Sequence, residues 1–297
     1  MSGATAAVRN VDSLLNAGVN FCAVIVSATK ILHLECMRWE RTPAPLGPPL
    51  TGDGAIDPDD LAPPNWGRVR EVMWHVPRLL SGLGPLTPRG PEDGSPALVI
   101  PGFLSTDRTT MELRRALARA GWRVHPWLLG LNSGAKANTL DLLKQRIDAI
   151  YDGRPVLVVG WSLGGMFARE LAFVAPDKVR AAVTLGSPFS GNLKTNTNVR
   201  EYYERIAGHD VNQPPFPRGT GKPPVPTLAL WSRKDGIVAP SAARGQAHEV
   251  DKAVEIDTHH MGFAVWRPAL SRVVAEVRAF LDEIEPPVRG RAGRRAG

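Results

Sequence analysis

The sequence predicts an α/β fold: a doubly wound, mostly parallel sheet with an inserted cap and an N-terminal helical extension. Three observations lead to this prediction. From residue 97 onward, short apolar runs alternate with helical patterns of about ten or more residues. One long proline-rich stretch interrupts this alternation, and a separate helical pattern lies before the alternation begins. The length of 297 residues and the hydrophobic content of 43% fit a globular protein with a sizeable core.

The first 94 residues are expected to form an extension to the main domain. Residues 10–39 predict a long helix, and residues 42–64, with seven prolines, predict an irregular connector. Polar side chains interrupt the apolar residues between 19 and 34, so this segment falls short of a membrane-spanning helix. We expect it to pack on the protein or to lie at a membrane surface. Cys22 and Cys36 are expected to be free thiols, which favours a cytoplasmic protein.

The main domain is expected over residues 95–285. Its predicted strands are runs of four or five mostly apolar residues, as expected for strands buried on both faces of a parallel sheet: 97–100, 123–127, 156–159, 181–185, 227–231 and 253–256. Its predicted helices have apolar residues at spacings of three and four: 111–120, 140–151, 164–175 and 268–284. Residues 286–297 are expected to form a disordered basic tail.

Residues 188–226 form the one long interruption between two predicted strands. They combine Tyr202, Tyr203 and Phe216 with many prolines, six of them between positions 214 and 226. A connection of this length is usually functional. Its place in a doubly wound sheet predicts a cap over the carboxyl ends of the strands.

The chemistry is carried by the pattern Gly-x-Ser-x-Gly at residues 160–164, directly after a predicted strand and before a predicted helix. A turn this tight strains the backbone at Ser162, and side chains at Gly160 and Gly164 would collide with the neighbouring elements. The turn would expose the Ser162 hydroxyl at the N-terminus of a helix, where negative charge is favoured. Ser162 is therefore the expected nucleophile.

A serine nucleophile needs a histidine base that is oriented by a carboxylate, in the chain order serine, acid, histidine. Asp235 follows the predicted strand 227–231, and His260 follows the predicted strand 253–256. We prefer His260 to the adjacent His259 because a glycine follows it at the distance needed for the chain to turn away. Asp251 and Asp257 are the alternative acids. Two adjacent histidines cannot chelate one ion as an i, i+4 pair does, so we expect no metal site.

The tetrahedral intermediate of such a reaction needs two backbone N–H donors for its oxyanion. Leu163, directly after the nucleophile, is expected to supply one. The other is expected from the loop after the strand 97–100, where Pro101 and Gly102 allow a close approach and leave the amide of Phe103 as the donor.

Together these segments resemble the α/β-hydrolase family, in particular its serine lipase and esterase branch. The resemblance covers roughly residues 95–285 and rests on residues 99–103, 160–165, 235 and 260–262. It implies Ser162 as nucleophile, Asp235 as acid, His260 as base, and the amides of Phe103 and Leu163 as oxyanion hole. Many members carry His-Gly at the start of the oxyanion loop, where this chain has Pro101-Gly102. Since the donor is a backbone amide, we expect the loop to keep its role.

The function that this pattern favours is hydrolysis of carboxylic esters through an acyl-enzyme on Ser162. Acyl transfer or thioester hydrolysis through the same intermediate is the alternative, and a non-catalytic binding protein is a third. The aromatic side chains of Trp161, Tyr202, Tyr203 and Phe216 predict a small, apolar acyl ester as substrate. No cofactor is expected. The formal net charge of +7 includes four arginines of the tail, so charge does not indicate nucleic-acid binding.

Overall fold

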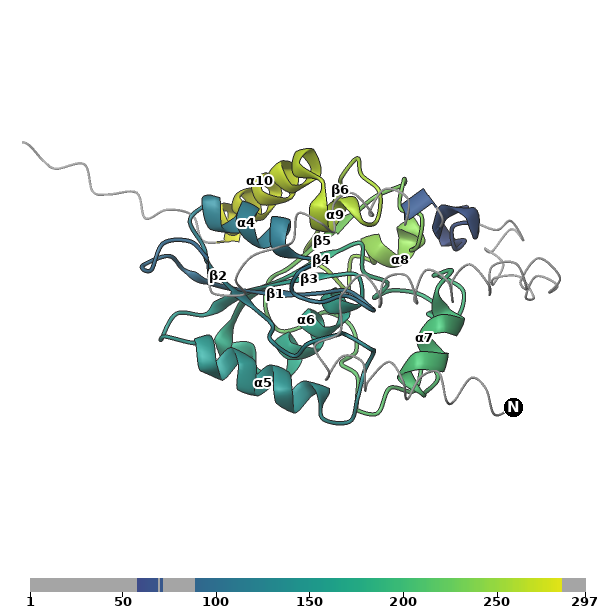
Figure 1. The fold of residues 1–297 in the computed structure, drawn as a ribbon, viewed down its shortest axis with the longest axis horizontal. Helices are drawn as coiled ribbons and strands as arrows, with labels where there is room; N and C mark the ends of the chain where they lie inside the picture. Colours follow the sequence, from purple (N-terminus) through teal and green to yellow (C-terminus); the bar gives the residue numbers. More distant parts are fainter. Residues whose placement is uncertain (1–57, 69, 72–88, 285–297) are drawn as a thin grey trace, which may run out of the picture. The chain divides into compact units, whose positions relative to one another are not determined.

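The structure is a computed structural model that describes residues 58–68, 70–71 and 89–284 (Figure 1). In this part of the chain, six strands form one sheet in the order β2-β1-β3-β4-β5-β6. Every neighbouring pair in this sheet is parallel. The strands are β1 (Pro96–Ile100), β2 (Arg123–Pro126), β3 (Val156–Trp161), β4 (Val179–Leu185), β5 (Thr227–Trp231) and β6 (Lys252–Glu255). The predicted α/β fold with a doubly wound parallel sheet is therefore confirmed.

The strand order explains why helices cover both faces of the sheet. The chain moves outward from β1 to β2 and then returns to the other side of β1 with β3. Helices α4 (Met111–Arg119), α9 (Gly262–Val265) and α10 (Arg267–Ile284) lie on one face, whereas α5 (Thr139–Ile150) and α6 (Leu163–Val174) lie on the other (Figure 1). Each connection between parallel strands is right-handed, so a reversal in the direction of winding moves the connecting helix to the other face of the sheet. The two helix layers therefore follow from the strand order.

Two apolar cores lie between the sheet and these helix layers. Successive residues of a strand point to opposite faces, and β1 shows the result. Ala97 and Val99 pack with α4 and α10, and Leu98 and Ile100 pack with α5 and α6. The strands are therefore apolar at nearly every position, which is the pattern by which the sequence predicts them.

The observed elements of the main domain begin and end within two residues of those predicted. Three short helices were not predicted. They are α7 (Arg200–Ala207) in the long insertion, α8 (Pro240–Arg244) after β5, and α9 after β6. The structure also describes the 3-10 helices η1 (Pro58–Asp60) and η3 (Pro176–Lys178), and helical residues at 66–68 and 70–71. The short helices lie in segments where tertiary contacts, and not an apolar repeat, determine the conformation.

Several predictions concern residues that the structure does not describe. The predicted helix 10–39, both cysteines, residues 42–57 of the connector and the tail 286–297 lie outside the described residues. The division of the chain at residues 94 and 285 therefore stays a prediction. Among the helices that are described, none is long and apolar enough to cross a membrane.

Candidate active site

The turn between β3 and α6 has the strained geometry that its sequence predicts. Ser162 has φ 55° and ψ −123°, in a region that residues with a side chain rarely adopt. A Cβ at Gly160 would lie 2.1 Å from the carbonyl oxygen of Gly164, and a Cβ at Gly164 would lie 2.2 Å from that of Ile100. Both contacts are with backbone, so only glycine fits either position.

Asp235 and His260 meet at the carboxyl edge of the sheet. Asp235 follows β5 and His260 follows β6, and the Oδ2 atom of Asp235 lies 2.7 Å from the Nδ1 atom of His260. Both side chains are buried. The other carboxylate oxygen of Asp235 accepts the backbone N–H groups of Ile237 at 2.8 Å and Val238 at 2.9 Å. These bonds hold the carboxylate in place against the imidazole.

The pKa of His260 reflects this environment. Burial by itself lowers the pKa of the imidazole, but the charge of Asp235, the hydrogen bond to Asp235 and the charge of Glu71 outweigh it, so that the pKa is raised above its ordinary value. Because a carboxylate only accepts hydrogen bonds, Nδ1 carries the proton that it shares with Asp235. The lone pair of the neutral ring is then on Nε2.

Ser162 and the Asp235–His260 pair lie on either side of the end of β4. The N–H of Ser162 donates to the carbonyl oxygen of Leu185 at 2.8 Å. A Cβ on the next residue, Gly186, would lie 2.9 Å from Asp235 Oδ2 and 3.2 Å from His260 Nδ1. Within the described residues, no hydrogen bond joins Ser162 Oγ to His260 Nε2. Catalytic hydrogen bonds often form only once substrate is bound.

The loop after β1 packs directly against the serine. A Cβ at Gly102 would lie 3.0 Å from the Ser162 Cβ, so the backbone of this loop approaches Ser162 closely. Neither the N–H of Phe103 nor that of Leu163 donates a hydrogen bond to another described residue. A buried asparagine, Asn132, braces the loop by donating to the carbonyl oxygen of Pro101 at 2.8 Å. Two backbone donors thus lie near Ser162 without an internal acceptor.

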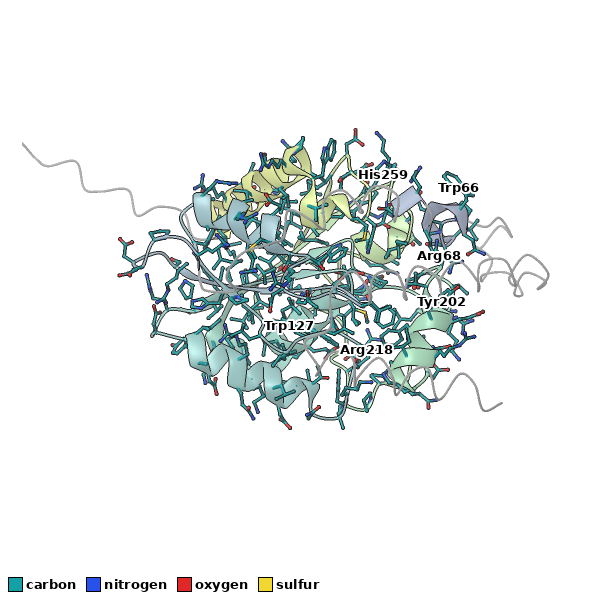
Figure 2. The ribbon with its side chains drawn as sticks, in the orientation of Figure 1. Trp66, Arg68, Trp127, Tyr202, Arg218 and His259 are labelled. Carbon is teal, nitrogen blue, oxygen red and sulfur yellow. The ribbon has the colours of Figure 1, made fainter. Side chains whose placement is uncertain are left out.

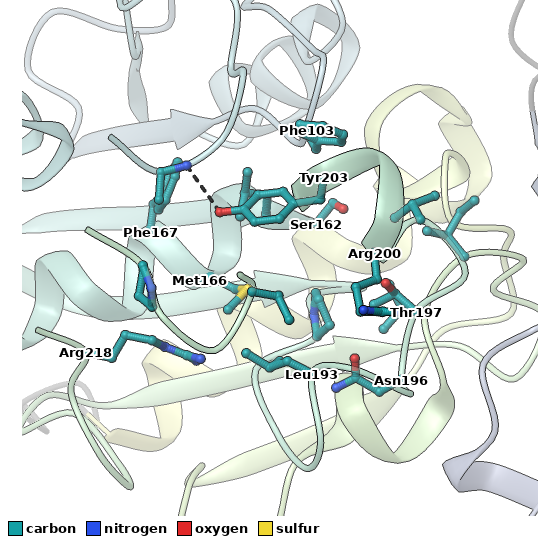
Figure 3. A pocket seen from close by; sticks show the side chains of 18 of the residues that line it. Phe103, Ser162, Met166, Phe167, Leu193, Asn196, Thr197, Arg200, Tyr203 and Arg218 are labelled. Carbon is teal, nitrogen blue, oxygen red and sulfur yellow. Dashed lines mark hydrogen bonds between the residues drawn. The ribbon is translucent and has the colours of Figure 1, made fainter. Parts of the chain in front are cut away.

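A cavity opens beside Ser162, between the main domain and the insertion (Figure 3). Of the residues predicted to contact substrate, Tyr203 and Phe216 line this cavity, as do Phe103 and Leu163. The rings of Phe103 and Tyr203 are 5.3 Å apart, and the Tyr203 hydroxyl accepts the N–H of Ala135 at 3.3 Å. Most of the remaining lining is apolar as well: Met166, Phe167, Pro188, Leu193, Val199, Val211, Pro214, Ile237 and Val238.

The structure does not bring the other two predicted contact residues, Trp161 and Tyr202, to the cavity. Trp161 is buried in the core, and its Nε1–H donates to the carbonyl oxygen of His260 at 3.0 Å. Tyr202 lies on α7 and does not line the cavity; the guanidinium of Arg68 is 5.2 Å from its ring centroid, and Figure 2 labels both residues. The contacts of Trp161 and Tyr202 indicate that both side chains stabilise the fold and do not contact substrate.

The alternative site residues have partners elsewhere. His259 Nδ1 lies 3.1 Å from the carbonyl oxygen of Lys234, and the exposed carboxylate of Asp257 forms an ion pair with the Lys234 ammonium group. Asp251 accepts the N–H of Thr227 at 2.8 Å, at the opposite end of β5 from Asp235. The geometry favours Asp235 and His260 over these residues.

Two side chains that the sequence analysis did not identify contribute to the site. Asn132 braces the loop after β1, and the carboxylate of Glu71 contacts the loops that carry Asp235 and His260. No motif or spacing marks either residue, because each acts through backbone groups that are distant in the sequence. In residues 58–68, 70–71 and 89–284, no group of three or more His, Cys, Asp or Glu side chains is arranged to hold a metal ion.

Comparison with known proteins supports the fold. A family model described as alpha/beta hydrolase fold matches residues 100–214. No curated protein sequence matches the chain.

Among solved structures, similarity is found to a thioesterase domain from the curacin biosynthetic pathway (17% identity, TM-score 0.48, covering 65% of this chain and 93% of that one). Similarity is also found to a bacterial membrane phospholipase A (16% identity, TM-score 0.48, covering 74% of this chain and 93% of that one). A third similar structure is naproxen esterase from Bacillus subtilis (17% identity, TM-score 0.44, covering 78% of this chain and 99% of that one). The assignment rests on the matching family model together with the parallel sheet and the strand–serine–helix turn. The chain has the α/β-hydrolase fold.

Proposed function

We propose that this protein is a serine hydrolase that cleaves carboxylic esters through an acyl-enzyme on Ser162. The observation that carries the proposal is the arrangement at one sheet edge. A strained serine at a helix N-terminus lies beside the loop of Phe103, and a buried histidine–aspartate pair lies across the end of β4. This is the set of groups that acyl transfer to a serine requires.

The reaction would proceed in two halves. In the first, Ser162 Oγ attacks the acyl carbonyl carbon while His260 Nε2 takes the hydroxyl proton, and Asp235 stabilises the resulting imidazolium. The N–H groups of Phe103 and Leu163 would donate to the oxyanion. As the tetrahedral intermediate collapses, the bond to the alcohol oxygen breaks and His260 returns the proton to the leaving alcohol. In the second half, water attacks the acyl-enzyme by the same route and releases the acid and free Ser162.

The cavity supports an apolar acyl group as the part of the substrate that is bound. Its walls next to Ser162 are aromatic and aliphatic. Its two arginines already face carboxylates: Arg200 lies 3.1 Å from Glu204, and Arg218 lies 3.7 Å from Glu170. Burial raises the pKa of Tyr203, so its hydroxyl is neutral at physiological pH. A charged acyl group would therefore find little compensation for its lost hydration.

The test is hydrolysis of p-nitrophenyl esters of increasing acyl length, with a serine-directed alkyl phosphonate as inhibitor. We expect release of p-nitrophenol by the parent protein, and a stoichiometric phosphonate adduct that peptide mass spectrometry locates on Ser162. The Ser162→Ala variant should lose at least about 10³-fold in kcat/KM and form no adduct. A Ser162→Ala variant with the kinetics of the parent would contradict the proposal. Transfer of the acyl group to an added alcohol in preference to water would identify an acyltransferase instead.

A further inference from the structure

Glu71 lies 165 to 190 positions away in sequence from the residues of the two loops that it holds together. One carboxylate oxygen, Oε1, accepts the N–H of His260 at 3.0 Å and the N–H of Gly236 at 3.1 Å. The other, Oε2, accepts the N–H of Met261 at 3.1 Å. The side chain is buried. A single carboxylate thus spans the loop after β5, which carries Asp235, and the loop after β6, which carries His260.

The segment that carries Glu71 is tied closely to the loop of Asp235. A Cβ at Gly67 would lie 2.7 Å from the carbonyl oxygen of Gly236, so the two backbones are in direct contact. The side-chain amide of Asn198 donates to this same oxygen at 2.9 Å and to the carbonyl oxygen of Pro63 at 3.0 Å. Arg70 donates to the carbonyl oxygen of Lys234 at 3.1 Å. These contacts leave the Glu71 carboxylate little freedom to move.

Hydrogen bonds from N–H groups to a buried carboxylate are stronger than those between neutral groups, and they are directional. Because Glu71 bonds the main chain of His260 itself, any displacement of Glu71 would move the base relative to Asp235. A misplacement of about 1 Å in an active site can cost about 10²-fold in rate.

We propose that Glu71 is a positioning residue of this site: it fixes the backbone of His260 relative to the loop of Asp235 and so directs the imidazole toward Ser162. The role in catalysis rests on the proposed hydrolase function. Glu71 does not line the cavity and touches no reacting atom. It acts through the backbone of the two loops that carry Asp235 and His260.

The charge of Glu71 supplies a second line of support. The charged groups that act on His260 are Asp235, from the loop after β5, and Glu71, from the segment before the sheet, and both raise the pKa of the imidazole against the effect of burial. Removal of the Glu71 charge would therefore lower the pKa of His260. A glutamate that only stabilised the fold, and whose charge did not act on His260, would leave this pKa unchanged.

The experiment compares Glu71→Gln with the parent protein and with Glu283→Gln. Glutamine has the shape of glutamate, but it removes the charge and turns an NH₂ group toward the N–H of Met261. Glu283 is an exposed residue of α10, so its variant has the same change in net charge away from the site. Two measurements are made. NMR gives the titration midpoint of the His260 imidazole in the absence of substrate, and steady-state kinetics gives kcat and KM for a short p-nitrophenyl ester from pH 5 to 9. A His260→Gln spectrum identifies the resonance.

For Glu71→Gln we expect the His260 midpoint and the acid limb of kcat/KM to move to lower pH. At the optimum, kcat should fall about 10- to 100-fold with KM within about twofold. Glu283→Gln should match the parent in both measurements. The proposal is overturned if Glu71→Gln titrates and turns over like the parent, or if kcat falls while the His260 midpoint stays in place.

If Glu71→Gln does not fold, Glu71→Asp decides the question. This variant keeps the charge and shortens the reach, so kcat should fall while the His260 midpoint stays near that of the parent. A Glu71→Asp variant with the kcat of the parent would overturn the proposal. Because the NMR titration needs no substrate, the experiment tests the role of Glu71 separately from the proposed hydrolase function. If even the parent hydrolyses no ester, the proposed function is wrong, and a shifted midpoint in Glu71→Gln still supports the action of Glu71 on His260.

Discussion

The indole Nε1–H of Trp161 donates a hydrogen bond of 3.0 Å to the carbonyl oxygen of His260, 99 positions along the chain. The Trp161 and His260 rings also pack at 5.6 Å between centroids. Trp161 directly precedes Ser162, so the residue beside the proposed nucleophile holds the main chain of the proposed base. Trp161 thus couples the position of the β3–α6 turn to that of the loop after β6, and this gives it a role different from the predicted contact with substrate.

Replacing Trp161 by Phe should lower kcat/KM several-fold without changing the preference for acyl length. The variant leaves the buried carbonyl of His260 without its donor, at a cost of about 1–3 kcal/mol in stability. Steady-state kinetics with a series of p-nitrophenyl esters and urea unfolding measure both effects. A change in the preferred acyl length would show instead that Trp161 contacts the acyl chain.

The two adjacent histidines should differ sharply in their effect. His260→Ala removes the group that lies 2.7 Å from Asp235 and should abolish nearly all ester turnover. His259→Ala removes a contact with the backbone of Lys234 and should have a modest effect. Both variants are compared with the parent by kcat/KM on one ester. If His259→Ala is the inactive one, our choice of base is in error by one residue.

Ser162→Gly should unfold at higher denaturant concentration than Ser162→Ala. The φ of 55° at this position strains any residue that has a Cβ, typically by 1–3 kcal/mol, whereas glycine adopts it freely. The larger entropy of glycine in the unfolded chain offsets about 0.5–1 kcal/mol of this gain. We therefore expect Ser162→Gly to be more stable by up to about 2 kcal/mol. Equal urea midpoints for the two variants would argue against stored strain at Ser162.

The insertion should select the acyl chain through the residues that face the cavity. Phe216→Ala removes an aromatic wall and should shift the preference toward longer acyl chains, with the largest change in KM. Tyr202→Ala is the matched control, because Tyr202 lies on the same insertion but packs with Arg68 outside the cavity. Ratios of kcat/KM across acyl lengths are the measurement. Identical profiles for Phe216→Ala and the parent would rule out a selecting role for Phe216.

A buried histidine away from the site should contribute to loss of stability in acid. Burial lowers the pKa of His125 in β2 to about 4, with Arg146 and Arg123 adding to the effect. Its Nε2 atom has no hydrogen-bond partner among the described residues. The unfolded chain binds a proton near pH 6.5 and the folded one only near pH 4, so stability falls as the pH drops between these values and levels off below.

The loss attributable to His125 should be of the order of 2–3 kcal/mol. His125→Phe keeps a ring but cannot titrate, so its free energy of unfolding should fall less than that of the parent between pH 7 and pH 4.5. Urea unfolding at the two pH values is the check. Parallel losses in the parent and in His125→Phe would mean that His125 does not bind a proton on unfolding.

What the sequence determined by itself is the part of the protein that depends on local patterns. The runs of buried residues in β1, β3 and β5 predict the sheet, since a strand buried on both faces must be apolar along its whole length. The two glycines around Ser162 predict the strained turn, because the contacts that exclude a Cβ are with backbone nearby in the fold. Once this turn is identified, the chain order predicts Asp235 as acid and His260 as base, and the structure brings these two side chains together.

Only the tertiary structure decided which side chains support these groups. Glu71 and Asn132 act on backbone amides and carbonyls far along the chain, and such contacts leave no periodicity in the sequence. Tyr202 and Tyr203 are neighbours on α7, yet one packs outside and the other lines the cavity, since successive residues of a helix point about 100° apart. The sequence shows both tyrosines alike, and the rotation of α7 against the sheet is set by packing that no single segment encodes.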